Sequence, residues 1–168
     1  MRFARIAALV ASTLAMTLSA PREVSAQDLG IERGSMAPGA KVATLDGKDA
    51  DLSAYIGKMP VLMEFWATWC SNCKELEPTL LSVSKKYAGR VRFIGVAVSV
   101  NETPDRVKAF VEKHGLPGDQ FFDNKGNATN AYDVPATSFV VVIDKTGKVV
   151  YTGLGGTQDL DAQLKKVL

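Results

Sequence analysis

Cysteine and histidine are scarce in this sequence of 168 residues, which has two cysteines, Cys70 and Cys73, and one histidine, His114. Two cysteines are too few for a disulfide framework and too few for a four-cysteine zinc site. The sequence also lacks a large excess of one charge, because it has 20 Lys and Arg residues and 18 Asp and Glu residues. We therefore expect neither a nucleic-acid-binding protein nor an acidic disordered tail.

Apolar runs long enough to span a bilayer are also missing after residue 26. The segment 1–26 has the pattern of an export signal, with Arg2 and Arg5 ahead of a short apolar run and small residues before a cleavage site at Ala26. We expect a cleaved signal peptide and an exported, periplasmic protein. An uncleaved signal would instead leave a weak N-terminal membrane anchor.

One domain is expected over residues 36–168, after a linker over residues 27–35, because a chain of this length is typical of a single domain. The signal carries the whole formal net charge of +2, so the mature chain is formally neutral. Long-range charge is therefore not expected to select its partners, and we expect a monomer.

Hydrophobic periodicity predicts strands that alternate with helices, which indicates an α/β fold with a mixed central sheet flanked by helices. An Asp46-Gly47 turn predicts an N-terminal hairpin, and residues 124–127 are expected to form a turn. The expected strands are 41–45, 48–52, 60–66, 91–100, 121–122, 138–144 and 148–151, and the expected helices are 70–88, 104–115 and 158–168, the last capped by Thr157.

The two cysteines lie where a buried strand gives way to a helix. The first turn of a helix presents unpaired N–H groups and the positive end of the helix dipole, which favour a thiolate at Cys70. Cys70 is therefore the expected nucleophile, and Cys73, one turn further, is expected to resolve a mixed disulfide. The same Cys-x-x-Cys spacing also occurs in half of a zinc or copper site.

Glu64 is the one acid in the apolar run 60–66. Side chains alternate along a strand, so Glu64 points away from the side of Met63 and Phe65. If the strand is central, helices cover both faces, and burial raises the pKa of the carboxyl group. A Glu that reaches solvent at a strand end is the alternative. His114 ends a helical stripe, where it is expected to bond terminal carbonyls rather than a metal.

The segment 65–74, FWATWCSNCK, followed by Pro78, closely resembles the active-site segment of thioredoxin-fold proteins. The segments 134–139 and 143–150 resemble that family's loop before its cis-proline and the hairpin after it. The similarity covers most of residues 36–168. Because of the N-terminal hairpin, the export signal and an inserted helix and strand over 104–122, the chain is identified as a member of the TlpA/ResA-like branch.

This resemblance implies roles for particular residues. Glu64 occupies the position of a buried acid that takes the Cys73 proton. The Val134–Pro135 bond is implied to be cis, with the backbone of Val134 pairing with an extended substrate. Trp69, next to Cys70, is expected to form part of an apolar docking surface, whereas Trp66 belongs to the core. Leu76 replaces the acid that is typical of cytochrome c maturation proteins in this branch.

The function expected from these features is that of an exported thiol-disulfide oxidoreductase that reduces protein disulfides. It needs no cofactor or metal, and a membrane electron donor is expected to reduce it again. A disulfide-donating oxidase is the first alternative, although Ser71-Asn72 offers neither a charge nor a ring to stabilise a thiolate. A copper-handling module that uses the two thiolates is an alternative of a different class.

Overall fold

The structure is a computed structural model that describes residues 29–168. The predicted signal peptide, residues 1–26, lies outside the described residues, so its cleavage stays a prediction. No helix within residues 29–168 is long and apolar enough to cross a membrane.

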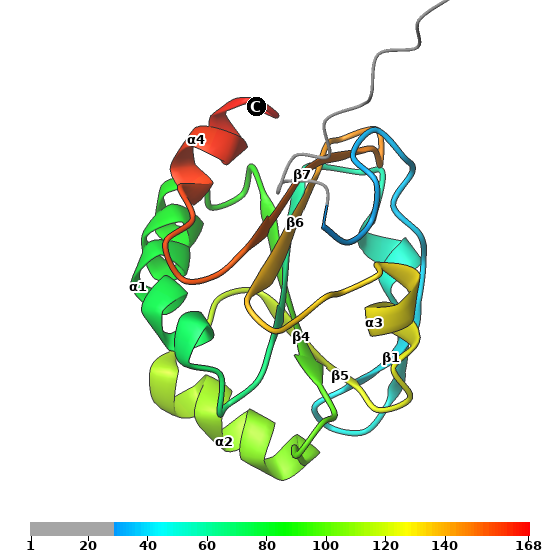
Figure 1. Ribbon diagram of the computed structural model, residues 1–168, viewed down its shortest axis with the longest axis vertical. Helices are drawn as coiled ribbons and strands as arrows, with labels where there is room; N and C mark the ends of the chain where they lie inside the picture. Colours follow the sequence, from blue (N-terminus) through cyan, green and yellow to red (C-terminus); the bar gives the residue numbers. More distant parts are fainter. Residues whose placement is uncertain (1–28) are drawn as a thin grey trace, which may run out of the picture.

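A seven-stranded mixed sheet runs through the centre of the described domain in the order β2-β1-β5-β4-β3-β6-β7 (Figure 1). The central strand β3 is parallel to β4 and antiparallel to β6. This is the α/β thioredoxin-type architecture that the sequence predicts. The strands are β1 (Lys41–Thr44), β2 (Asp49–Asp51), β3 (Val61–Trp66), β4 (Arg92–Val98), β5 (Asp119–Asp123), β6 (Phe139–Ile143) and β7 (Val149–Leu154).

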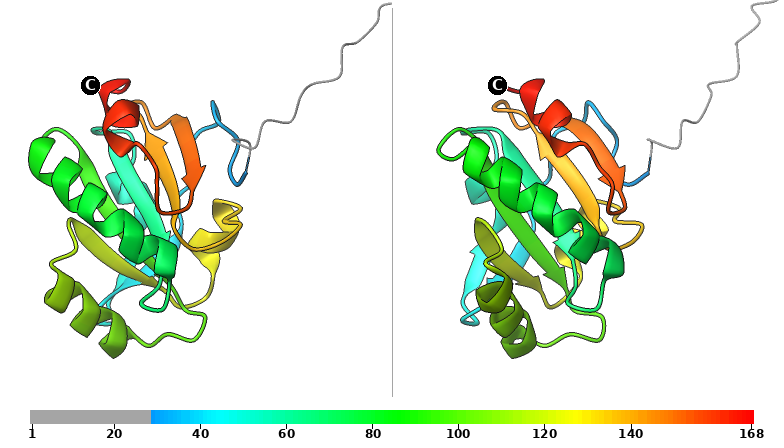
Figure 2. Two further views of the ribbon diagram at one scale, coloured as in Figure 1. Left: turned by 60° about the vertical axis from the view of Figure 1, so that its left-hand side comes forward. Right: turned by 90° about the vertical axis from the view of Figure 1, so that its left-hand side faces the viewer.

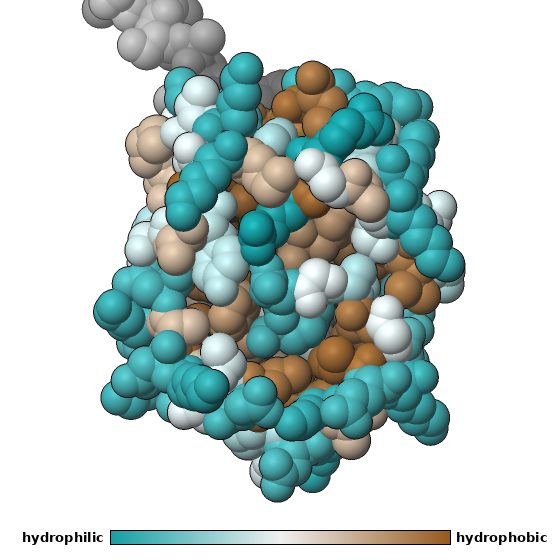
Figure 3. All heavy atoms as spheres, turned by 180° about the vertical axis from the view of Figure 1, so that it is seen from behind, coloured by the Kyte–Doolittle hydropathy of each residue, from teal (hydrophilic) through white to brown (hydrophobic). Residues whose placement is uncertain are grey.

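Helices cover both faces of this sheet (Figure 2). Helices α1 and α2 lie on one face, where α4 packs beside α1 and Lys86 contacts Asp161 at 2.6 Å. Helix α3 lies on the opposite face. Seen from behind the view of Figure 1, the surface of the molecule has apolar patches between hydrophilic side chains (Figure 3). The helices are α1 (Ser71–Lys86), α2 (Pro104–His114), α3 (Asn127–Ala131) and α4 (Leu160–Lys165), with a 3-10 turn at Leu52–Tyr55.

The two faces of β3 contact different buried hydrophobic clusters. Val61, Met63 and Phe65 join a core on the α3 side, whereas Leu62 joins a core beneath α1 and α4. Because side chains alternate along a strand, Glu64 faces the same side as Leu62, toward α1. All six residues of β3 are buried, which confirms the prediction of a central strand covered on both faces.

Local signals account for the ends of several elements. The hairpin turns at Gly47, whose φ of 78° suits glycine. Helix α2 begins after Thr103, whose side chain accepts from the Arg106 N–H, and ends at Gly115 with a φ of 64°. Both the hairpin and the limits of α2 were predicted from the sequence.

Two helices and the segment before the first strand differ from the prediction. Helix α3 begins inside the expected turn 124–127, because buried Asp123 accepts hydrogen bonds from the first N–H groups of the helix, including that of Ala128. Asp159, not Thr157, caps α4 by accepting from the Ala162 N–H. In the segment expected to be a linker, Ile31 is buried in the core and donates its N–H to the Tyr132 carbonyl oxygen at 3.0 Å.

Candidate active site

Cys70 and Cys73 form a disulfide at the junction of β3 and α1, with their Cα atoms 5.3 Å apart. Cys70 is the N-cap residue of α1, and its sulfur accepts the Cys73 N–H at 3.0 Å. Both residues are more than nine-tenths buried, so exposure does not separate their roles in the disulfide form. Their positions in the helix separate their roles, because Cys70 lies at the helix N-terminus, whose N–H groups would stabilise its thiolate.

Glu64 is buried on the α1 side of β3, as the strand alternation predicts, with 7% of its surface exposed. Its Oε1 atom has no hydrogen-bond partner within the described part of the chain. Burial, together with the negative charge of Glu77, raises the pKa of Glu64 to about 8. The carboxyl group of Glu64 is therefore mostly protonated at neutral pH in the disulfide form of the protein.

Glu64 and Cys73 line the same small cavity between β3, α1 and α2, together with Glu77 and Phe110. Water can occupy about 10 Å³ of it, roughly the space of one molecule. Cys73 and Glu64 thus border a space that one water molecule can fill, an arrangement suited to proton transfer between them. This places the predicted acid beside the predicted resolving cysteine.

His114 and Glu77 form a contact that sequence reasoning missed. The Nδ1 atom of His114 lies 3.1 Å from both carboxylate oxygens of Glu77, and its ring stacks on Phe110. The expected bond between His114 and helix-terminal carbonyls is not the contact found, because the Gly115 N–H bonds the Val111 carbonyl oxygen. The two residues are 37 positions apart, and no local pattern in the sequence links them.

A second missed residue is Glu102, in the loop after β4. Its side chain is fully covered, and Oε1 accepts the Thr68 N–H at 2.6 Å. The same loop provides the Val100 carbonyl oxygen, which accepts from Trp69 Nε1 at 2.9 Å. The loop thus holds the residues that precede Cys70 at two points. An acid in a polar loop gives no sequence signal for this role.

The tryptophans divide as predicted between surface and core. Trp69, next to Cys70 in the chain, is 47% exposed, and Val100, whose carbonyl oxygen bonds the Trp69 ring, is 62% exposed, so both present apolar surface. Trp66 is buried and packs against Phe110 with ring centroids 5.5 Å apart. The role of Trp69 in docking stays a prediction.

The loop 134–138 differs from the expectation at Pro135. No peptide bond within residues 29–168 is cis, so the expectation of a cis Val134–Pro135 bond is wrong. The Val134 N–H donates to the Thr129 carbonyl oxygen at 3.0 Å, and its side chain packs against the core on the α3 side. Pro135 is exposed. The backbone N–H of Val134 is therefore already used within the fold.

Ser138 is the loop residue that is bonded to the active-site strand. Its N–H donates to the Phe65 carbonyl oxygen at 2.8 Å, and its hydroxyl donates to the Gly155 carbonyl oxygen at 3.0 Å. These bonds hold a buried residue with a φ of 63°, which is uncommon outside glycine. Thr137, partly exposed and directly before it, is thus fixed near the end of β3.

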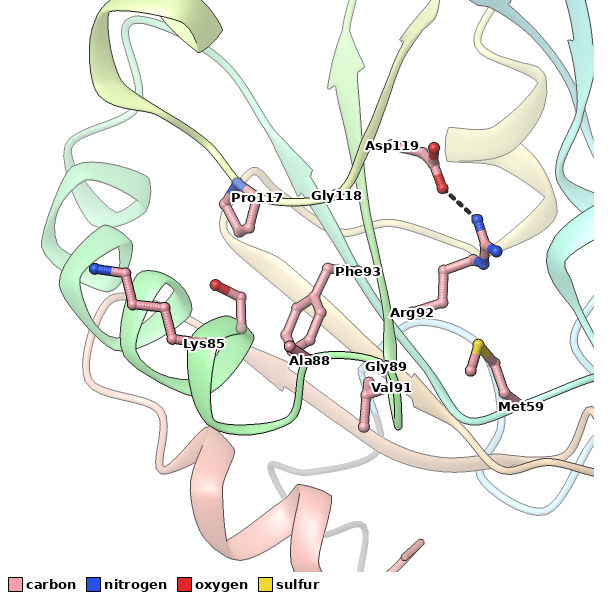
Figure 4. A pocket seen from close by; sticks show the side chains of 11 residues that line it. Met59, Lys85, Ala88, Gly89, Val91, Arg92, Phe93, Pro117, Gly118 and Asp119 are labelled. Carbon is pink, nitrogen blue, oxygen red and sulfur yellow. Dashed lines mark hydrogen bonds and ion pairs between the residues drawn. The ribbon is translucent and has the colours of Figure 1, made fainter.

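A second groove lies at the other end of α1, away from the cysteines (Figure 4). Lys85 from α1 and Phe93 from β4 line it, and an ion pair of 2.6 Å joins Arg92 to Asp119. It is remote from the disulfide, because Lys85 is in the last turn of the helix that Cys70 caps. It takes no part in the redox site.

Comparisons with known proteins match nearly all of the described domain. A family model described as Redoxin matches residues 32–168. The thiol-disulfide oxidoreductase ResA of Geobacillus thermodenitrificans is 32% identical over 136 residues, which is 80% of this chain and 77% of ResA. The thioredoxin-like protein YneN of Bacillus subtilis is 28% identical over 143 residues, 83% of each chain.

Solved structures of thiol-disulfide proteins are also similar to this chain. A putative thiol:disulfide interchange protein DsbE from Chlorobium tepidum is 27% identical with a TM-score of 0.65, and the match covers 81% of this chain and 94% of that protein. A putative protein disulfide isomerase from Bacteroides thetaiotaomicron is 26% identical with a TM-score of 0.70, covering 83% and 93%.

Proposed function

The chain belongs to the redoxin family as a thioredoxin-fold thiol-disulfide oxidoreductase of the TlpA/ResA type, and from this premise we propose that it reduces disulfides of exported proteins through Cys70 and Cys73. The observation that carries the proposal is the disulfide at the start of α1, with Glu64 lining the same cavity as Cys73. These groups supply a nucleophile, a resolving thiol and a proton acceptor.

The proposed reaction begins when the Cys70 thiolate attacks a substrate disulfide. A bond forms between Cys70 and one substrate sulfur, and the other substrate sulfur leaves as a thiolate that takes a proton from solvent. Cys73 then gives its proton to the Glu64 carboxylate and attacks Cys70. The Cys70–Cys73 bond forms, the second substrate sulfur leaves, and two electrons have passed to the substrate.

A dithiol donor returns the enzyme to its reduced form. A donor thiolate attacks the Cys70 sulfur, and Cys73 leaves as a thiolate that takes the proton back from Glu64. The second donor thiol then releases Cys70 and becomes oxidised. We propose an electron-transfer protein of the membrane as this donor, because an exported protein has no access to cytosolic reductants.

The reducing direction is supported by the two residues between the cysteines. Strongly oxidising thiol-disulfide oxidoreductases stabilise the thiolate of their reduced form. Ser71 and Asn72 are exposed and uncharged, and neither has a ring that could carry a positive charge. Neither residue therefore adds a positive charge to the effect of the helix N-terminus on Cys70, which favours a reductase over an oxidase.

The rim of the site favours an extended protein segment as substrate. Trp69 and Val100 supply exposed apolar surface next to Cys70. On the other side of β3, Thr137 offers a backbone close to the strand end, and an extended segment could pair with it by strand addition. This assigns to Thr137 the pairing expected of Val134, whose N–H is already bonded.

Turnover of insulin disulfides in the presence of a thiol donor tests this function. We expect catalysed reduction of insulin, and Trp69→Ala should lower its rate roughly tenfold, because a large exposed aromatic residue often dominates docking. Reduction of a small disulfide such as glutathione disulfide should change little in the same variant, and circular dichroism should confirm its fold. An equal loss with both substrates would remove Trp69 from the docking surface, and no catalysed insulin reduction would overturn the proposed function.

We also propose export to the periplasm, based on the sequence of residues 1–26. The protein recovered from the cell envelope should then begin at Gln27, which intact-mass measurement detects. A full-length mass in the membrane fraction would indicate the N-terminal anchor instead, and a full-length mass in the cytosol would exclude export.

A further inference from the structure

Two acidic side chains face one cavity beside the disulfide. Glu64 enters it from β3 and Glu77 from α1, and Cys73 lines it as well. The proposed reaction uses Glu64 and Cys73 but gives no role to Glu77. Two carboxylates in a covered space repel each other, so one of them is favoured in its protonated form. Because its buried Oε1 atom accepts no hydrogen bond from the described residues, Glu64 is the acid whose negative charge is less stabilised.

His114 contacts Glu77, whose side chain lines this cavity. Its Nδ1 atom lies 3.1 Å from both Glu77 oxygens, so the ring can donate a hydrogen bond to that carboxylate. The His114 ring lies flat on Phe110, with centroids 3.9 Å apart and an interplanar angle of 9°. Phe110 in turn packs against Trp66. The position of the Glu77 carboxylate is thus fixed by α2.

Few other charged groups can act on Glu64. On the α1 side the cavity is also lined by Lys74, which is exposed. On the side of β4 and β5, the residues next to Glu64 include Gly95 and Gln120 and none that is ionisable. Its neighbour on β6 is Val140. Among the residues that line these cavities, Glu77 is the one that places a negative charge near Glu64.

We propose that Glu77, held by His114, keeps the proton of Cys73 on Glu64 for as long as the Cys70–Cys73 disulfide stands. This inference rests on the proposed function, in which Cys73 gives its proton to Glu64 during resolution. The negative charge of Glu77 makes loss of that proton to solvent unfavourable. When a donor thiolate attacks Cys70, the leaving Cys73 sulfur takes the stored proton. Glu77 and His114 are positioning residues, because neither touches the reacting sulfurs.

The Glu77→Gln variant separates this role from a structural one, because it should affect the two directions differently. The titration midpoint of Glu64 in the oxidised protein, followed by carbon-13 NMR, should fall by roughly one pH unit. Reduction of the oxidised protein by dithiothreitol at pH 7.5 should slow roughly threefold, since fewer molecules keep the proton. Resolution of a mixed disulfide at the same pH should not slow. Glu75→Gln, an exposed change on the same helix, should alter none of these.

Two variants of His114 test the hold on Glu77. His114→Phe keeps an aromatic ring against Phe110 but loses the contact, so it should shift the Glu64 midpoint in the same direction as Glu77→Gln. His114→Gln can still donate to Glu77 and should restore most of the wild-type midpoint. Thermal unfolding shows whether each variant is folded.

An unchanged Glu64 midpoint in folded Glu77→Gln, or an equal slowing of both directions, would overturn the inference. Failure of the proposed function gives a different result. In that case a Cys73→Ser variant would trap no mixed disulfide, whatever the Glu64 midpoint does in the oxidised protein.

Discussion

Cells that express the Cys73→Ser variant should accumulate mixed disulfides between Cys70 and natural substrates. The variant keeps the nucleophile at the start of α1 but lacks the thiol that releases it. Cys70→Ser should trap almost nothing, because Cys73 lies within the helix rather than at its N-cap, where the helix N-terminus favours a thiolate. Both variants should lose catalysed insulin reduction entirely. Non-reducing electrophoresis and mass spectrometry of the trapped species measure the difference.

The double variant, with serine at both positions, controls for association without a covalent bond. Equal trapping by the two single variants would contradict the assigned roles of attacking and resolving cysteine. Residual insulin turnover in Cys70→Ser would contradict them as well.

Glu64→Gln should slow resolution by Cys73 by about a hundredfold to ten-thousandfold, because a buried thiol loses its proton acceptor. The amide keeps the shape of the side chain, and alkylation of Cys70 by a small reagent should change much less. Stopped-flow decay of a preformed mixed disulfide between pH 6 and pH 9 measures the effect. A rate equal to that of the wild type across this range would show that Cys73 ionises without Glu64.

The same variant should change how stability depends on pH. Glu64 has a pKa of about 8 in the fold against an ordinary 4.5, so the folded state binds more protons between these values. Stability of the wild type therefore falls as pH rises from 4.5 to 8, and the cost of the buried charge is absent below 4.5. Glu64→Gln removes this cost, which reaches about 5 kcal/mol above pH 8.

Urea denaturation of the oxidised proteins at pH 5 and at pH 9 tests this effect. Glu64→Gln should be close to the wild type in free energy of unfolding at the lower pH and clearly more stable at the higher one. Glu75→Gln serves as the exposed control. A difference between Glu64→Gln and the wild type that does not grow with pH would mean that Glu64 is not a buried acid.

The centre of the site could be predicted because its signals are local. The continuous apolar run of β3 indicates burial on both faces, and the alternation of its side chains places Glu64 under α1. The position of Cys70 and Cys73 at the start of a helix follows from the same run and from the helical stripe after it. The resemblance to thioredoxin-fold proteins rests on these residues too.

Contacts between distant segments could not be predicted in this way. His114 meets Glu77 only because α2 packs beside α1, and Glu102 meets Thr68 only because two loops lie together. The loop 134–138 was assigned from its proline, whereas the hydrogen bonds to β3 and to Gly155 are made by Ser138. A side chain that bonds across the fold leaves no periodic pattern in its own segment.

The equilibrium reduction potential of the Cys70–Cys73 couple, measured against glutathione, tests the proposed reductase most directly. Proteins that reduce disulfides have potentials near that of thioredoxin, about −270 mV, whereas strong oxidants lie near −120 mV. Because Ser71 and Asn72 add no positive charge to the effect of the helix N-terminus on the Cys70 thiolate, we expect a value at or below about −230 mV. A value near −120 mV would contradict the account and identify a disulfide donor.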